Sequence, residues 1–147
     1  MCWDQDSDLG RLAPLVLQTN VFDRSTIPAK FLCYYSNMSA VLIRDKITTT
    51  DLVKAKEDYG DYIKVVVNVE TKAMAIGGQW HADGEKLLLD EGSQQSNLWG
   101  GGIKLTTKTI DYTALINIRA QVNPSHVIMD AKIRAVFDQI IKDKFNL

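Results

Sequence analysis

The residues best suited to chemistry stand within five positions of one another, in the run His-Ala-Asp-Gly-Glu at 81–85. An imidazole can exchange a proton near neutral pH, and carboxylates can assist it or hold a divalent ion. His81 and Glu85 are four residues apart, so they share a face of any helix that begins early enough, whereas Asp83 points elsewhere. These three residues are the candidate catalytic group.

The spacing matches no standard metal motif, because the His-Glu-x-x-His pattern supplies two imidazoles on one helical face and this run has one. A metal would need further ligands from elsewhere in the chain, so metal and cofactor are left open. The competing interpretation is structural. Asp83 and Glu85 then place negative charge at the start of a helix, while His81 bonds to backbone or packs under Trp80.

Four further residues are candidate binding residues: Trp80, Trp99, Asn117 and Arg119. Trp99 lies in an apolar run, which predicts a core or cleft anchor. Arg119 can bind a carboxylate or phosphate with two parallel hydrogen bonds, or form a surface salt bridge or a pair with Glu85. Because buried charge needs a partner, we expect Arg119 to lie close to at least one of the three candidate catalytic residues.

Together, the motifs between Gly77 and Arg119 resemble the pattern of a family of small prokaryotic proteins known only as a domain of unknown function. Its pattern runs Gly-Gly-x-x-His-Ala-Asp-x-Glu, Gly-Ser, Leu-Trp-Gly and Leu-Ile-Asn-Ile-Arg. The matching positions are Gly77, Gly78, His81, Ala82, Asp83, Glu85, Gly92, Ser93, Leu98, Trp99, Gly100 and Leu115 to Arg119. The resemblance runs from about Thr49 to the C-terminus. It departs from the pattern at Gly101-Gly102 and Ala120, where Asn and Pro are expected. It implies a fold unit and no known reaction.

Hydrophobic periodicity predicts the elements that position these residues. The expected strands are 40–43, 62–69, 73–76, 97–105 and 114–119, and the expected helices are 51–59, 82–91 and 130–145. The order β-α-β-β-α-β-β-α with short turns indicates a single α+β domain, with a mostly antiparallel sheet of about five strands and three helices on one face. In the expected strand 114–119, Asn117 and Arg119 share a face.

Two glycine runs mark special backbone. Gly77-Gly78 follows an apolar run and suits a tight strand-to-helix turn. Gly100-Gly101-Gly102 indicates a bulge, a flexible loop or a backbone that another group approaches closely. No Gly-Lys-Ser/Thr follows the second run, so a phosphate loop is not favoured.

Composition places limits on the partners. The 147 residues carry a formal net charge of −1, which gives no basic field for non-specific nucleic-acid binding. The apolar stretch 12–17 is short and broken by Pro14, so no membrane span is expected. Cys2 and Cys33 form no Cys-x-x-Cys motif, and a reducing cytoplasm is the simplest location.

Residues 1–37 show no sustained period, hold both cysteines and lie outside the resemblance. We therefore expect an irregular N-terminal extension outside the folding unit, a domain over residues 38–147, and Met38 as a candidate for the true start. A competing expectation is that Phe31 to Tyr35 adds an edge strand.

Two function classes follow from these observations. The first is a small binding or regulatory domain, a homodimer among its forms, that holds a ligand or protein partner in a polar cleft around Trp80, His81, Trp99 and Arg119. The alternative is a small metal-assisted hydrolase or nuclease-like enzyme. In it His81 exchanges a proton, Asp83 and Glu85 hold a metal or assist the proton, and Arg119 stabilises an anion.

Overall fold

The computed structural model describes residues 39–147, which form one compact unit. The expectations for residues 1–37, for an edge strand at 31–35 and for Met38 as a start lie outside these residues. No helix of the described part is long and apolar enough to cross a membrane.

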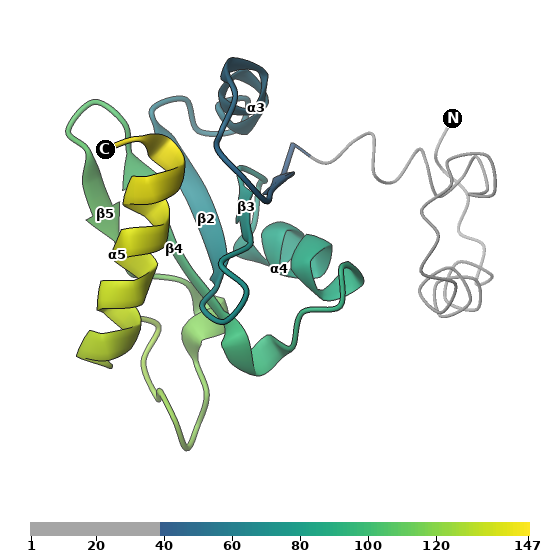
Figure 1. Cartoon of the computed structure of the whole chain (residues 1–147). Helices are drawn as coiled ribbons and strands as arrows, with labels where there is room; N and C mark the ends of the chain where they lie inside the picture. The colour runs from purple at the N-terminus through teal and green to yellow at the C-terminus, as the bar shows by residue number, and fades with distance from the viewer. Residues whose placement is uncertain (1–38) are drawn as a thin grey trace, which may run out of the picture. The chain divides into compact units, whose positions relative to one another are not determined.

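The centre of the domain is an antiparallel sheet of five strands in the order β1-β3-β2-β4-β5 (Figure 1). The strands are β1 (Val41–Ile43), β2 (Tyr62–Asn68), β3 (Met74–Ile76), β4 (Leu98–Lys104) and β5 (Thr109–Asp111). The β-branched residues of β2 suit an extended backbone, and this strand lies at the centre of the sheet. It pairs with β4 over seven residues, from Tyr62 opposite Lys104 to Asn68 opposite Leu98.

Three helices complete the domain: α3 (Thr49–Ala55), α4 (His81–Asp90) and α5 (Ala131–Phe145). Thr48 begins α3 through a capping box with Asp51, and the Asp130 carboxylate accepts from Lys132 N at the start of α5. Two short 3₁₀ turns lie at Gln95–Asn97 (η1) and Leu115–Asn117 (η2). The predicted order of strands and helices is confirmed.

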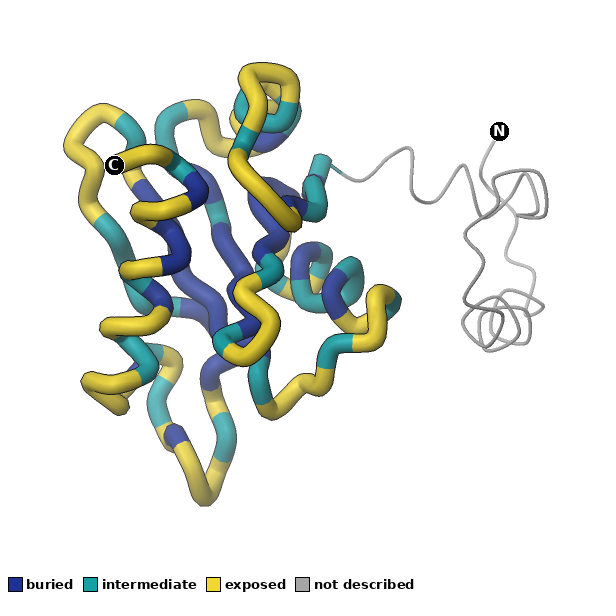
Figure 2. The backbone as a smooth tube through the Cα atoms, viewed as in Figure 1, coloured by how far each residue is buried: buried dark blue, intermediate teal, exposed yellow. Residues whose placement is uncertain are grey.

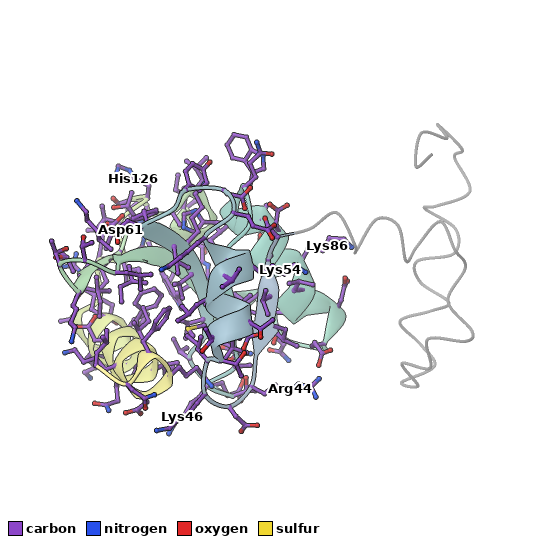
Figure 3. The ribbon with its side chains drawn as sticks, turned by 90° about the horizontal axis from the view of Figure 1, so that it is seen from above. Arg44, Lys46, Lys54, Asp61, Lys86 and His126 are labelled. Atoms are coloured by element: carbon purple, nitrogen blue, oxygen red, sulfur yellow. The ribbon has the colours of Figure 1, made fainter. Side chains whose placement is uncertain are left out.

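The helices cover both faces of the sheet, so the expectation of a single covered face is wrong. Val65 and Val67 of β2 join the larger core with Phe137 of α5, whereas Val66 points the other way and packs with Leu88 of α4. Figure 2 shows the strands buried between these helices, and Figure 3 shows the same layers from above. The physical reason is that β2 is apolar at consecutive positions, so each of its faces has to be covered.

The predicted strand at 114–119 is also wrong, because the backbone there forms η2, and the fifth strand is Thr109–Asp111. Leu115 and Ile118 are 76% and 51% exposed, whereas Asn117 is fully buried, the reverse of the expected pattern. The Asn117 side chain bonds both backbone groups of Gly100: its Oδ1 accepts from the N–H at 2.8 Å, and its Nδ2 donates to the carbonyl at 2.9 Å. An amide side chain thus makes the contacts that a fifth strand would have made with its backbone.

The three glycines of β4 lie in a regular strand without a bulge. Their lack of side chains lets neighbouring residues approach the strand backbone closely. A Cβ at Gly100 would lie 2.6 Å from the Ala114 Cβ. A Cβ at Gly101 would lie 2.2 Å from the Asp111 carbonyl oxygen and 2.8 Å from the Phe137 ring. All three distances are shorter than a real Cβ contact allows, so only glycine fits at these two positions.

We predict that Gly101→Ala destabilises the domain by about 3 kcal/mol or more, because the added methyl group collides with backbone and with a buried ring. Urea unfolding measures this loss. Gly60→Ala is the matched control: Gly60 has a φ of +62° but nothing within 4 Å of its Cβ position, so only the backbone cost of about 1–2 kcal/mol applies. A loss at Gly101 no larger than that at Gly60 would contradict the role of close approach.

Candidate functional site

The turn before α4 sets the position of the candidate residues. Gly77 and Gly78 have φ values of +78° and +90°, and a Cβ at Gly77 would lie 2.8 Å from the Ala55 Cα. Glycine is needed at both positions because other residues rarely adopt such a backbone. The Asp83 carboxylate then accepts from the Trp80 N–H at 2.8 Å, which fixes the first turn of α4. Asp83 therefore has the capping position that the structural interpretation expects.

His81 is the first residue of α4, and its Nε2 lies 2.7 Å from the carbonyl oxygen of Gly101. Because a carbonyl only accepts, Nε2 carries the proton, and Nδ1 is an acceptor in the neutral ring. Burial lowers the pKa of His81 below its ordinary value, the charge of Lys64 lowers it further, and the Gly101 hydrogen bond and the Asp111 charge oppose the shift. The imidazole is therefore mostly neutral at pH 7.

Lys64 of β2 lies on the α4 side of the sheet among Tyr59, Gln79 and Trp80. Its Nζ is 4.0 Å from the Tyr59 ring centre and 5.5 Å from the Trp80 ring centre. It also donates to the Gln79 carbonyl, which accepts from the Tyr59 hydroxyl as well, at 3.1 Å. We call Tyr59, Lys64 and Trp80 the aromatic–lysine cluster; its two aromatic residues, Tyr59 and Trp80, are 47% and 62% exposed.

Next to this cluster, Tyr62 lies over Gly102 and donates its hydroxyl to the Asp111 carboxylate at 3.1 Å. Burial, followed by the Asp111 charge, raises the pKa of Tyr62, so the phenol keeps its proton. Asp111 also accepts from the Thr113 N–H at 3.2 Å and acts electrostatically on His81. The Asp111 carboxylate therefore already accepts two hydrogen bonds from within the fold.

Arg119 occupies a second location, around η1 and the start of β4. Its guanidinium donates to the carbonyls of Ser96, Gln95 and Leu98, and its Cζ lies 4.2 Å from the Trp99 ring centre. Burial lowers the pKa of Arg119, and the Glu85 charge opposes that shift. Glu85 is thus close enough to act on Arg119, in line with the expectation that Arg119 lies near one of the three acidic or histidine candidates. Through these hydrogen bonds, Arg119 connects η1 to the start of β4.

The candidate residues consequently separate into two groups joined by α4. Trp80 and His81 lie with Lys64, whereas Glu85, Trp99 and Arg119 lie near η1, where Glu85 accepts from the Gln95 amide at 3.1 Å. Trp99 is only 2% exposed, as expected for a core anchor, and Asn117 is buried. Within residues 39–147, no three His, Cys, Asp or Glu side chains are placed to hold a metal ion.

Three residues of this region, Tyr59, Lys64 and Asp111, were not among those predicted from the sequence. Lys64 had a usable signal, because it is the one charged residue inside the apolar run of β2. Tyr59 and Asp111 had none, because only the folded turns bring them to the start of α4. The second histidine, His126, is exposed at the periphery of the domain, as Figure 3 shows.

A model of the family described as "Protein of unknown function (DUF5674)" matches residues 41–144 of the chain. The match includes β1 and so begins before Thr49, where the resemblance seen in the sequence began. No curated protein matches the chain. No solved structure matches it.

We predict that His81 makes stability fall as the solution becomes acidic. The pKa of His81 in the folded protein lies below the unfolded value of about 6.5. Its contribution is therefore complete above pH 6.5 and decreases below it, because the unfolded chain binds the proton more readily. Between pH 7 and pH 5, urea unfolding of the wild type should lose more free energy than that of His81→Gln, which keeps a donor for Gly101 but does not titrate. Equal losses in the two proteins would contradict the prediction.

Proposed function

The chain belongs to the DUF5674 family, and we propose that it is a binding domain whose ligand lies on the aromatic–lysine cluster beside His81. The observation that carries this proposal is the environment of Lys64. Its ammonium group contacts two exposed rings and a carbonyl, and the ion pairs of residues 39–147, Arg44–Glu91 and Lys86–Asp90, do not include it.

Exposure of the rings supports the same proposal. Trp80 is 62% exposed although indole is costly to leave in water, and aromatic side chains are enriched at binding sites. The ring stands on a rigid base, because its own backbone N–H is bound by Asp83 and the preceding glycine turn is packed against α3. A rigid anchor reduces the entropy lost on binding.

The hydrolase alternative needs His81, Asp83 and Glu85 to act together on a metal or a proton. Asp83 bonds to the Trp80 N–H and Glu85 to the Gln95 amide, so each acid has a structural partner. These contacts favour binding over catalysis. From the sequence arguments, we further propose a cytoplasmic protein of a prokaryotic cell.

We predict that ligands of the wild-type protein lose affinity when the cluster is altered. A thermal-shift screen of nucleotides, aromatic amino acids, organic acids and divalent metals identifies ligands, because a ligand that binds only the folded state raises its melting temperature. We expect Trp80→Ala and Lys64→Met each to lower the affinity for these ligands by about tenfold or more, which corresponds to roughly 1.4 kcal/mol of binding free energy. Leu115→Ala is the control, since it removes another exposed apolar side chain and should change nothing.

Ligands that stabilise the two cluster variants as strongly as the wild type would refute the proposed site. Stabilisation by a divalent metal that is lost in His81→Gln and Asp83→Asn would favour the hydrolase instead.

A further inference from the structure

We infer that the ligand is a planar aromatic ring that carries an anionic group, either a carboxylate or a phosphate. The inference rests on the proposed function and names the chemistry of its ligand. In the complex, the ring stacks on Trp80 and the anionic group binds the Lys64 ammonium.

The charge of Lys64 is the first argument. Its contacts are the rings of Tyr59 and Trp80 and the carbonyl of Gln79, all of them neutral. The neighbouring acids are engaged elsewhere, since Asp111 accepts from Tyr62 and Thr113 and Asp83 accepts from Trp80 N. An incoming anion therefore gains a charge-assisted hydrogen bond without breaking an existing ion pair.

The start of α4 adds to this positive character. The helix has ten residues and begins at His81, directly after Trp80, so the positive end of its dipole lies beside the cluster. The Asp83 carboxylate in its first turn accepts from Trp80 N and offsets part of that positive charge, so the ammonium of Lys64 is the main attraction for an anion. The charge of Lys64 lowers the pKa of His81, while the charge of Asp111 opposes that shift. A cationic ligand would meet repulsion here, and a wholly apolar ligand would bury the ammonium without compensation.

The arrangement of the rings provides the aromatic part of the inference. Nζ lies closer to the Tyr59 ring, at 4.0 Å, than to the Trp80 ring, at 5.5 Å, and Trp80 is the more exposed of the two. The ammonium of Lys64 therefore contacts the Tyr59 ring more closely than the Trp80 ring, and the larger exposed fraction of Trp80 favours its indole as the stacking surface. The 5.5 Å separation lets a ring stacked on Trp80 bring an attached anionic group to Lys64.

Two matched ligand pairs test the inference and separate its two sources: indole-3-carboxylate against indole-3-carboxamide, and adenosine 5′-monophosphate against adenosine. Calorimetric titration of the full chain gives each affinity. We expect the anionic member of at least one pair to bind about tenfold or more tightly than its neutral partner, since hydrogen bonds to charged groups are the stronger ones. This preference should weaken as salt is raised.

Lys64→Met should abolish the preference for the anion, Lys64→Arg should keep it, and Trp80→Ala should weaken both members of the pair. Lys104→Met is the matched control, because Lys104 is an exposed lysine on β4 and its loss should leave the preference intact. Circular dichroism verifies that each variant is folded.

Equal binding of the anionic and neutral members, or a preference that persists in Lys64→Met, would overturn the inference. If both members bind equally and Trp80→Ala lowers both affinities, the proposed binding site stands and only the ligand class is wrong. Binding that is unaffected by both Trp80→Ala and Lys64→Met would refute the site itself. Failure of all four compounds to bind would overturn the inference, while the wider screen continues to decide the proposed function.

Discussion

The structure depends on three successive glycines in β4, because their lack of side chains lets other groups contact the backbone from both faces of the sheet. Asn117 and Ala114 approach Gly100, Phe137 and the Asp111 carbonyl approach Gly101, and Tyr62 covers Gly102. In most sheets, side chains keep helices about a side-chain length away from the strand. Here the layers meet the strand itself, so its position is fixed by contacts that tolerate little change in volume.

The same strand connects the core with the surface around α4. The carbonyl of Gly101 accepts from His81, and Gly102 leaves room for the Tyr62 ring that bonds Asp111. The N-terminal end of α4 is therefore positioned by a backbone group of the central sheet. This explains how an exposed ring such as Trp80 can have a defined place although little packs against it.

Buried amides give the segment after β5 its shape. The Asn117 amide also lies within hydrogen-bond distance of the carbonyls of Tyr112 and His126, at 3.1 and 3.0 Å. Asn123 does the same for Asn117, Ser125 and Val127, and its oxygen accepts from Met129 N. Two side chains thus satisfy backbone groups that neither a helix nor a strand would satisfy.

The sequence was informative wherever local pattern and tertiary packing agree. Hydrophobic periodicity predicted the elements at β2, α3 and α5, although α3 spans Thr49–Ala55 and the expected helix was 51–59. The strand predicted at 114–119 was wrong because its alternation of apolar and polar residues was interpreted as a strand period. In the fold, Asn117 is buried, whereas Leu115 and Ile118 are exposed. Such an exchange depends on Gly100, seventeen residues away, and no local rule contains it. The same limit applies to the site: the acids near His81 were visible in the sequence, but the partners that engage them were not.

The last turn of α5 also has a consequence for the order in which the domain can form. Lys144 is 8% exposed, and its ammonium donates to the carbonyls of Arg44 and Asp45, while its own carbonyl accepts from Ile47 N. The two bonds of the ammonium join residues 100 and 99 positions apart. Contacts of such long range form late, after shorter loops have closed. On the ribosome, the loop between β1 and α3 must wait until the end of α5 has emerged. Until then the face of the sheet that α5 covers in the folded domain stays exposed to water, as in other partly folded chains.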